Sequence, residues 1–258
     1  MQPIYTIFRR EFRSYFFSLT AYVVLTAFIV GMGYFLFFFS GNIFEKGDAG
    51  MDDFFFMAPM ALMIIIPLIT MRSFAEENQN GTIELLYTRP INDWQILLGK
   101  YFSAMALVLI MLLPSLLYYY FINIIAKPAG QIDGVMIMQD TLDGFQWSKL
   151  DNGPIIGAYL GLIGIGSIFV GIGLLTSTLT DNVIVAFILS LTINVFLYIV
   201  LHSLADVDGL SFLSRIGIWD HYTSVWKGVI DSRDVIYLVS VNTILIIASK
   251  IVLTNRRK

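Results

Sequence analysis

Residues 101–125 read YFSAMALVLIMLLPSLLYYYFINII and contain no charged side chain. A helix rises about 1.5 Å per residue, so about 20 apolar residues cross the roughly 30 Å hydrocarbon core of a bilayer. This stretch is therefore long enough to span a membrane as one helix. The whole chain has the same character, because 57% of its 258 residues are hydrophobic and only 14% are charged. Soluble proteins carry about 25% charged residues, so much of the surface of this protein is expected to face lipid.

Five further apolar runs flank this stretch along the chain. Together they predict six membrane-spanning helices, at about residues 19–41, 54–71, 101–125, 155–175, 183–204 and 235–253. The predicted fold class is an all-α integral membrane protein with a single transmembrane domain over residues 1–258. The first run is too long for a signal-peptide core and no clear cleavage site follows it, so it is expected to remain as an anchor.

The distribution of Lys and Arg predicts that both termini lie in the cytoplasm, because cationic residues near span ends mark that side. With six spans, the side of the termini holds Arg9, Arg10, Arg13, Arg72, Arg89, Lys100, Arg256, Arg257 and Lys258. The other side holds Lys46, Lys127, Lys149, Arg215, Lys227 and Arg233, spread over longer loops. The predicted location is the cytoplasmic (inner) membrane, with several passes.

Residues 2–17 are predicted to form an amphipathic helix that lies in the membrane interface. Apolar residues recur there at helical spacing, at Ile4, Ile7, Phe8, Phe12 and Phe16. The other faces of this helix carry Arg9, Arg10 and Arg13. Aromatic and aliphatic residues opposed to arginine are typical of interfacial helices, and a simple cytoplasmic tail is the alternative.

Residues 205–234, before the last span, are predicted to form an amphipathic helical hairpin at the outer leaflet. Their apolar residues also follow helical spacing, at Leu210, Leu213, Ile216, Trp219, Tyr222, Trp226 and Ile230. We expect Trp219, Tyr222 and Trp226 to lie at the interface, where aromatic residues are enriched. An exposed loop is the alternative.

Residues 72–100, between the second and third spans, read RSFAEENQNGTIELLYTRPINDWQILLGK. Ser73 and Glu76 have the spacing of a capping box, which predicts a helix start. Asn80–Gly81 predicts its end, because both residues tolerate positive φ. A further short helix is expected from Thr82 to about Tyr87.

Pro90 is expected to end that second helix, and Asn92 with Gln95 is a second capping signal that leads into the third span. Short stiff helices joined directly to two spans can transmit a push, which a flexible tether could not. A plain ordered connector is the alternative.

Two further features concern the fourth and fifth spans. Gly157 with Gly161, and Ser167 with Gly171, form small-xxx-small patterns that allow close helix approach, either within the chain or between two copies. Thr180 or Asp181 is expected to cap the fifth span.

The sequence lacks the residues that most membrane enzymes and carriers need. It has no cysteine and only two histidines, so disulfides, thiolate sites and histidine-rich metal sites are excluded. Lys250 and His202 lie near span ends, and no charge lies deep in a predicted span, which argues against an ion-coupled carrier. No G-x-x-x-x-G-K-[ST] phosphate loop is present. We therefore expect no catalytic residue, no bound metal or cofactor, and no binding of nucleic acid.

Four short runs in residues 72–100 resemble the permease subunits of type-2 ABC transporters. They are Phe74-Ala75-Glu76-Glu77, Gly81-Thr82-Ile83-Glu84-Leu85-Leu86, Arg89-Pro90 and Gly99-Lys100. The resemblance implies a membrane-spanning subunit without enzymatic activity, which docks on a separate cytoplasmic ATPase that binds ATP and Mg²⁺ and drives export. It also implies a second permease half, as a homodimer or a sibling chain. The coupling residues that it implies are Glu76, Glu77, Gly81, Thr82, Glu84 and Leu85.

The C-terminal run from Gly228 to Tyr237, GVIDSRDVIY, is similar to the gliding-motility subgroup of this family, the GldF-type permeases. That resemblance implies a GldA-like ATPase and a GldG-like subunit as partners. Permeases of copper-site maturation in the nitrous-oxide reductase system share parts of the pattern and are an alternative. A membrane scaffold that assembles a complex without transport is the other.

Overall fold

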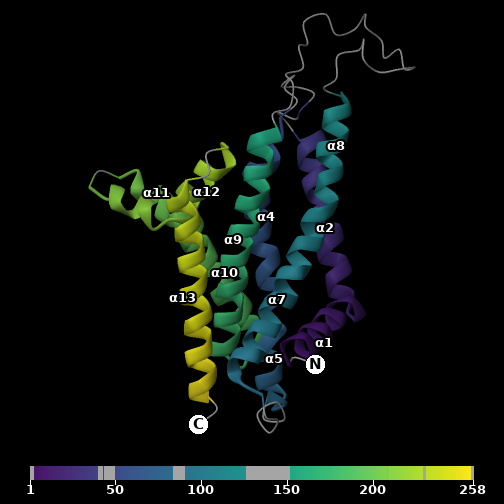
Figure 1. The fold of residues 1–258 in the computed structure, drawn as a ribbon, viewed down its shortest axis with the longest axis vertical. Coiled ribbons are helices and arrows are strands. Elements are labelled where there is room, and N and C mark those ends of the chain that lie inside the picture. The colour runs from purple at the N-terminus through teal and green to yellow at the C-terminus, as the bar shows by residue number, and fades with distance from the viewer. Residues whose placement is uncertain are drawn as a thin grey trace, which may run out of the picture.

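The computed structural model describes residues 3–39, 43, 50–83, 91–125, 152–207, 209–228 and 231–256. Within these ranges, six helical stretches are long and apolar enough to cross a membrane (Figure 1). They are formed by α2 (Leu19–Phe38), α4 (Asp52–Thr70) with α5 (Arg72–Gln79), α7 (Asp93–Leu112) with η1 (Leu113–Ser115) and α8 (Leu116–Ile125), α9 (Asn152–Leu179), α10 (Val183–Val195) with the π-helical η4 (Phe196–Val200) and α11 (Leu201–Ala205), and α13 (Ser232–Arg256). The predicted six-span, all-α fold class is confirmed.

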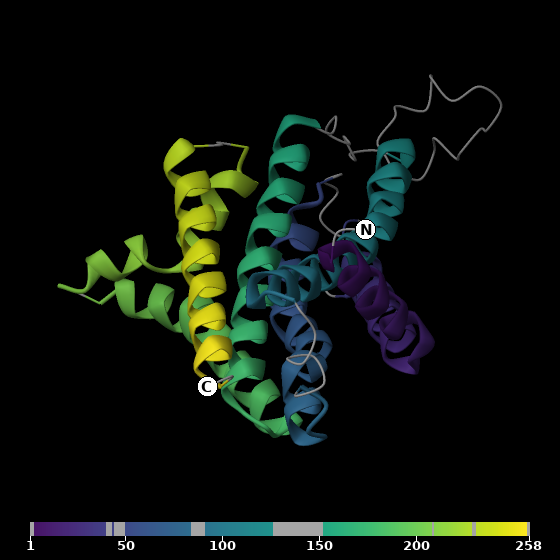
Figure 2. The ribbon, with the colours of Figure 1, turned by 60° about the horizontal axis from the view of Figure 1, so that its bottom comes forward.

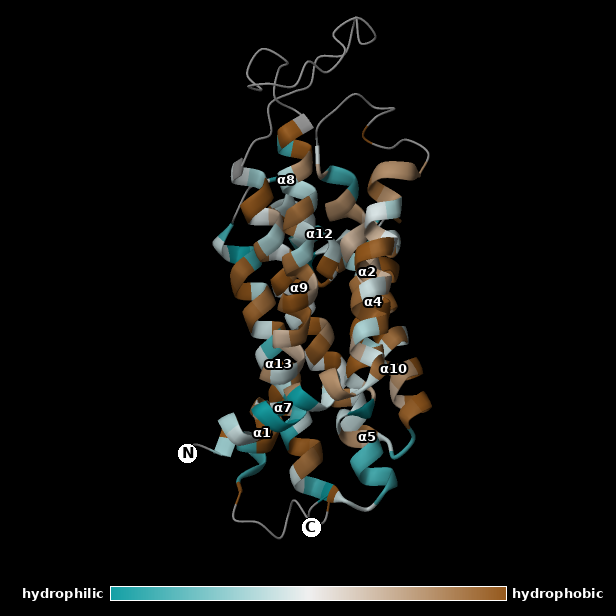
Figure 3. Ribbon diagram, turned by 90° about the vertical axis from the view of Figure 1, so that its right-hand side faces the viewer, coloured by the Kyte–Doolittle hydropathy of each residue, from teal (hydrophilic) through white to brown (hydrophobic). Residues whose placement is uncertain are grey.

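Three shorter helices complete the described structure. α1 (Pro3–Phe17) precedes the first span, and η5 (Ser211–Arg215) with α12 (Ile218–Trp226) lies between α11 and α13. α1, α5 and the end of α13 lie at one end of the bundle, and α12 lies toward the other end (Figure 1). Hydrophobic residues dominate the middle of the bundle, whereas hydrophilic residues gather around α1, α5 and the start of α7 (Figure 3).

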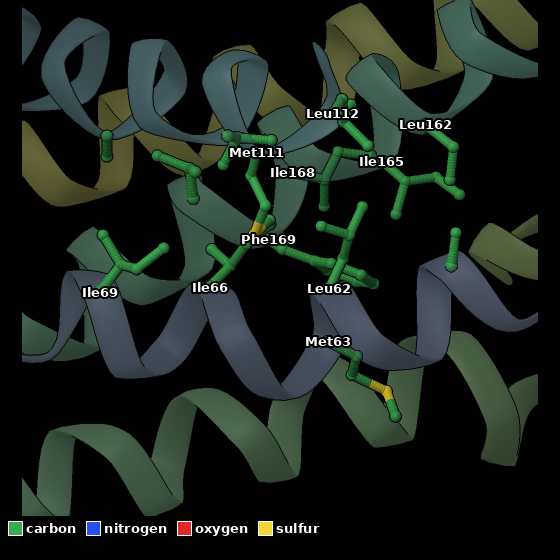
Figure 4. Packing of buried hydrophobic residues seen from close by; sticks show 14 of the residues in the cluster. Leu62, Met63, Ile66, Ile69, Met111, Leu112, Leu162, Ile165, Ile168 and Phe169 are labelled. Carbon is green, nitrogen blue, oxygen red and sulfur yellow. The ribbon is translucent and has the colours of Figure 1, made fainter. Parts of the chain in front are cut away.

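The centre of the bundle is α9, which contacts α4, α7, α10, α12 and α13. Apolar side chains of α4, α7 and α9 face one another and form the core (Figure 4). Buried members of this core are Leu62, Ile66, Ile69, Met111, Leu112, Leu162, Ile165, Ile168 and Phe169. α9 is apolar on all sides, as expected of a helix surrounded by other helices.

Small residues let α9 approach its neighbours closely. A Cβ atom at Gly164 would lie 2.8 Å from Leu238 Cδ1 of α13, and one at Gly173 would meet Thr70 Oγ1 of α4 well inside van der Waals contact. Gly161 faces Tyr222, and Gly171 faces Leu245. The glycine pattern of the fourth span therefore serves packing within the chain, which is one of the two uses that the sequence leaves open.

Three expectations about single residues are wrong. Ser73 does not begin a helix, because α5 follows α4 after Met71 alone and Ser73 is buried in its first turn. Asn182, rather than Thr180 or Asp181, caps α10, and its Oδ1 accepts from the amides of Ile184 and Val185. Local sequence offers several candidate caps, and the direction of the incoming chain decides between them.

The third wrong expectation concerns Tyr222, which was predicted to lie at the interface. Its side chain is 1% exposed and points into the bundle, where the hydroxyl donates to the Phe55 carbonyl over 2.7 Å. α12 is present as predicted, but it packs against α9 and so buries part of its aromatic stripe. Helical spacing identifies such a stripe without showing which neighbour covers it.

Candidate functional site

The segment predicted to couple the spans to a partner begins as a direct extension of the second span. α5 follows α4 with only Met71 between them, so the break leaves amide groups of α5 without partners in α4. Ser177 of α9 satisfies them, since its Oγ accepts from the amides of Phe74 (2.9 Å) and Ala75 (3.0 Å) and donates to the Met71 carbonyl. α5 is thereby fixed to the central helix of the bundle.

The predicted end of the helix at Gly81 and the predicted start of the third span at Asn92 are both present. α5 ends at Gln79, and Gly81 adopts φ +68°, the left-handed conformation that favours glycine. α7 begins at Asp93 behind a capping box of Asn92 and Gln95, in which the Asn92 amide donates to Gln95 Oε1 over 3.1 Å. The expected helix over 82–87 falls mainly on residues 84–90, which lie outside the described residues.

Lys100 of α7 is the centre of a buried ionic cluster at this end of the bundle. Its side chain is 1% exposed, and Nζ lies 3.0 Å from Glu77 Oε1 and 3.4 Å from Glu11 Oε1. Nζ also donates to the Ser73 carbonyl and lies 4.8 Å from the centre of the Phe74 ring. A buried ammonium group needs such partners, because removing a charge from water without compensation is very unfavourable.

Arg10 of α1 closes the cluster from the solvent side. Its guanidinium lies 2.6 Å from Glu11 Oε1 and 3.1 Å from Glu77 Oε1. Burial disfavours the charged form of Glu11, but Lys100 and Arg10 outweigh this effect and hold the pKa of the Glu11 carboxyl below its ordinary value. The ionic cluster, which we define as Arg10, Glu11, Glu77 and Lys100, thus joins α1, α5 and α7.

An apolar contact supports the same junction. Ile7 of α1 is buried against Gly99 of α7, where a Cβ atom would lie only 2.7 Å from Ile7 Cγ2. Only glycine at position 99 allows α1 to lie this close to α7, and this closeness brings Glu11 within reach of Lys100. Gly99 and Lys100 therefore act together, one through its small size and the other through its charge.

The coupling residues implied by the resemblance occupy different positions around this cluster. Glu77 points inward as a member of it, whereas Glu76 is exposed on the surface of α5. Gly81 and Thr82 are exposed at the tip, and Thr82 Oγ1 donates to the Glu77 carbonyl over 3.3 Å. Glu84 and Leu85 lie outside the described residues.

The three arginines of the interfacial helix also occupy different environments. Arg10 belongs to the ionic cluster, and Arg9 and Arg13 are exposed on α1. The helix is present over Pro3–Phe17, and its place in a membrane interface stays a prediction.

The sequence analysis missed the parts that Lys100 and Glu11 play. Lys100 directly precedes an uncharged run and so was interpreted only as a cation that marks the end of a span. A signal was available in Glu11, the single acidic residue of α1, which stands among three arginines. Lys100 is buried by α1 and α5 at the polar end of the bundle, so the expectation that no charge lies deep in a predicted span stays a prediction.

The fold and this site define a class of protein, a six-span membrane subunit with a structured junction at one end. Within the described residues, no group of three or more His, Asp or Glu side chains could hold a metal ion. The family described as ABC-2 family transporter protein matches residues 6–212, and the chain belongs to this family. Its members are transmembrane permease subunits that are not themselves catalytic, and membership implies an ATPase partner and a dimeric arrangement. A search of curated proteins found no match.

Proposed function

We propose that this chain couples ATP hydrolysis by a separate ATPase subunit to substrate export, and that the segment 72–100 receives the force. The observation that supports this most is the ionic cluster, which joins α5 to α1 and α7 while Ser177 joins α5 to α9. A displacement of α5 by a partner would therefore be passed to the spans. Because α5 is helical and fixed to its neighbours, we do not expect it to absorb this displacement as a flexible loop would.

The proposed contact with the ATPase lies at the tip of the segment. Glu76, Gly81 and Thr82 are exposed there, and Glu77 supports α5 from inside. Glu84 and Leu85 follow directly in sequence, and the family resemblance adds them to the contact. In this proposal the ATPase faces the cytoplasm and binds ATP and Mg²⁺, while this chain binds neither.

The particular system that we propose is gliding motility. The similarity of residues 228–237 to GldF-type permeases supports this assignment, with a GldA-like ATPase and a GldG-like subunit as partners. The second permease half would be another copy of this chain or a sibling permease. We place the complex in the cytoplasmic membrane with both termini inside, as the distribution of Lys and Arg predicts.

Co-purification with the candidate ATPase tests the coupling. We expect Glu84→Arg to weaken the association and to abolish ATP-dependent function, while membrane insertion is retained. Asp206→Arg is the matched control, because it makes the same charge change at an exposed residue near the opposite end of the bundle. Full association and nucleotide-dependent activity of Glu84→Arg would remove the coupling assignment, and a complex that never responds to nucleotide would favour the scaffold alternative.

A further inference from the structure

A cleft of about 490 Å³ lies where α1 meets α2, opposite the α4–α5 junction. Ala21, Leu68 and Ile69 give it an apolar part, and hydroxyl-bearing residues such as Ser14 and Ser18 line the polar part. The cleft is therefore lined both by apolar residues of the spans and by polar residues of the hydrophilic end of the bundle. A ligand with a polar head and an apolar tail would match both parts.

Three basic and three acidic residues line this cleft, so its formal charge is balanced. Four of them are the ionic cluster and largely neutralise one another. The remaining two are Arg72 and Glu76, which are exposed and whose side chains make no ion pair or hydrogen bond with any described residue. In addition, Glu77 Oε2 is buried and has no hydrogen-bond partner within the described part of the chain.

These groups without partners carry opposite charges, so they favour different parts of a ligand. Arg72 requires an anion, and the start of α2 adds to this demand because its N-cap Ser18 makes no side-chain hydrogen bond to the first turn. Glu76 can pair with a cation, and the buried Glu77 Oε2 lacks a hydrogen-bond donor, so a cation that donates hydrogen bonds suits both. A ligand that carries both charges satisfies each group and leaves the balanced cleft neutral.

We propose that this cleft binds the zwitterionic headgroup of phosphatidylethanolamine from the adjacent leaflet, with the phosphate toward Arg72 and the ammonium toward Glu76 and Glu77. Phosphatidylglycerol offers no ammonium group for the two glutamates. Phosphatidylcholine has the same net charge, but its trimethylammonium group cannot donate a hydrogen bond. The site would hold one lipid between the interfacial helix and the second span, beside the proposed ATPase contact with which it shares Glu76.

Native mass spectrometry of the detergent-purified chain tests this site. Phosphatidylethanolamine, phosphatidylcholine and phosphatidylglycerol with identical acyl chains are titrated separately onto delipidated protein. We expect phosphatidylethanolamine to bind most tightly, and Arg72→Gln to weaken it about tenfold, the effect of losing one charge-assisted hydrogen bond. Arg13→Gln is the matched control, because Arg13 is an exposed arginine of α1 outside the cleft, and it should leave binding unchanged.

A second variant fills the cleft without changing its charge. Ser14 is exposed and lines the cleft, so Ser14→Leu should exclude the headgroup while α1 stays helical, which circular dichroism verifies. Equal binding of the three lipids, equal losses in Arg72→Gln and Arg13→Gln, or full binding to Ser14→Leu would each overturn the proposal. Water-soluble phosphoethanolamine that binds as tightly as the lipid would show a site for a soluble zwitterion instead. ATPase co-purification, measured on the same variants, reports on the coupling separately.

Discussion

At the end of the bundle that carries α1, four charged side chains join three helices, whereas α12 is joined to its neighbours mainly by aromatic packing and hydrogen bonds. Arg10, Glu11 and Glu77 surround Lys100 at the first end. Near the other end, Tyr222 donates to Phe55 of α4, and His221 Nδ1 lies 2.7 Å from Asp234 Oδ1 of α13. The rings of Trp219 and Tyr198 also pack edge to face there, 5.2 Å apart.

This difference suggests different roles for the two ends: the ionic cluster can rearrange when a partner binds, whereas the contacts of α12 keep their positions. The ion pairs of the exposed Arg10 can exchange partners, because water or a partner protein can replace what Arg10 loses. A phenol buried between spans has no such replacement, so breaking its hydrogen bond leaves a polar group unsatisfied. We infer that the end with the ionic cluster receives the signal and that α12 anchors the opposite end.

The largest expected effect is that of Lys100→Met, which removes the buried cation shared by Glu11 and Glu77 and leaves them paired only with the half-exposed Arg10. We expect the free energy of unfolding to fall by about 3 kcal/mol, the low end for a broken buried ion pair, because both carboxylates keep some exposure. Thermal unfolding in detergent, followed by circular dichroism, measures this change. Arg13→Gln should leave stability nearly unchanged, and an equal loss in both variants would refute a special role for the cluster.

Alanine at two glycines of α9 compares the packing of the two ends. Gly173→Ala drives a methyl group into Thr70 near α5 and should cost about 2 kcal/mol, whereas Gly161→Ala meets the Tyr222 ring at 3.1 Å and should cost less. Gly31→Ala is the control, since nothing lies within 4 Å of its new Cβ atom, and it should stabilise through helix propensity. Equal melting temperatures for the three variants would show that α9 is not closely packed.

Tyr222→Phe tests the anchor near α12 without removing its ring. Losing the hydrogen bond to the Phe55 carbonyl should cost about 1 kcal/mol. Tyr5→Phe, at a side chain that is 54% exposed on α1, is the control and should be neutral. The same unfolding assay measures both variants, and a neutral Tyr222→Phe would mean that the hydroxyl does not hold α12 in place.

Acidification should weaken the end with the ionic cluster. The lowered pKa of Glu11 means that its ion pairs add stability above its ordinary pKa near 4.5, and that this stability is lost as pH falls through the lower folded value. The difference in unfolding temperature between the wild type and Glu11→Gln should therefore be largest near neutral pH and shrink toward acid. A difference that stays constant across this range would contradict a charged role for Glu11.

The sequence predicts the number and class of the spans because apolar runs of this length have few alternatives. It also predicts the end of α5 at Gly81 and the start of α7 at Asn92, since both signals are local. The position of Tyr222 could not be predicted, because helical spacing identifies the apolar face of α12 but does not show which helix packs against it.

The ionic cluster could not be predicted either, although all four of its residues are visible in the sequence. Glu11 and Lys100 are far apart along the chain, and they meet only because Ile7 packs closely on Gly99. A buried lysine at the end of a span and a cation that marks topology look the same in sequence. The distinction depends on the placement of α1, which is a tertiary contact.

Site-specific cross-linking at the tip of α5 tests the proposed coupling most directly, because the chain contains no cysteine of its own. Thr82→Cys would be coupled through a thiol–amine cross-linker to the co-purified ATPase, with Asp206→Cys near the opposite end as the control. We predict a cross-link at Thr82→Cys whose yield changes when ATP is added, and none at Asp206→Cys. Labelling of Thr82→Cys from the extracytoplasmic side, or no cross-link to the bound ATPase, would contradict the coupling role of this segment.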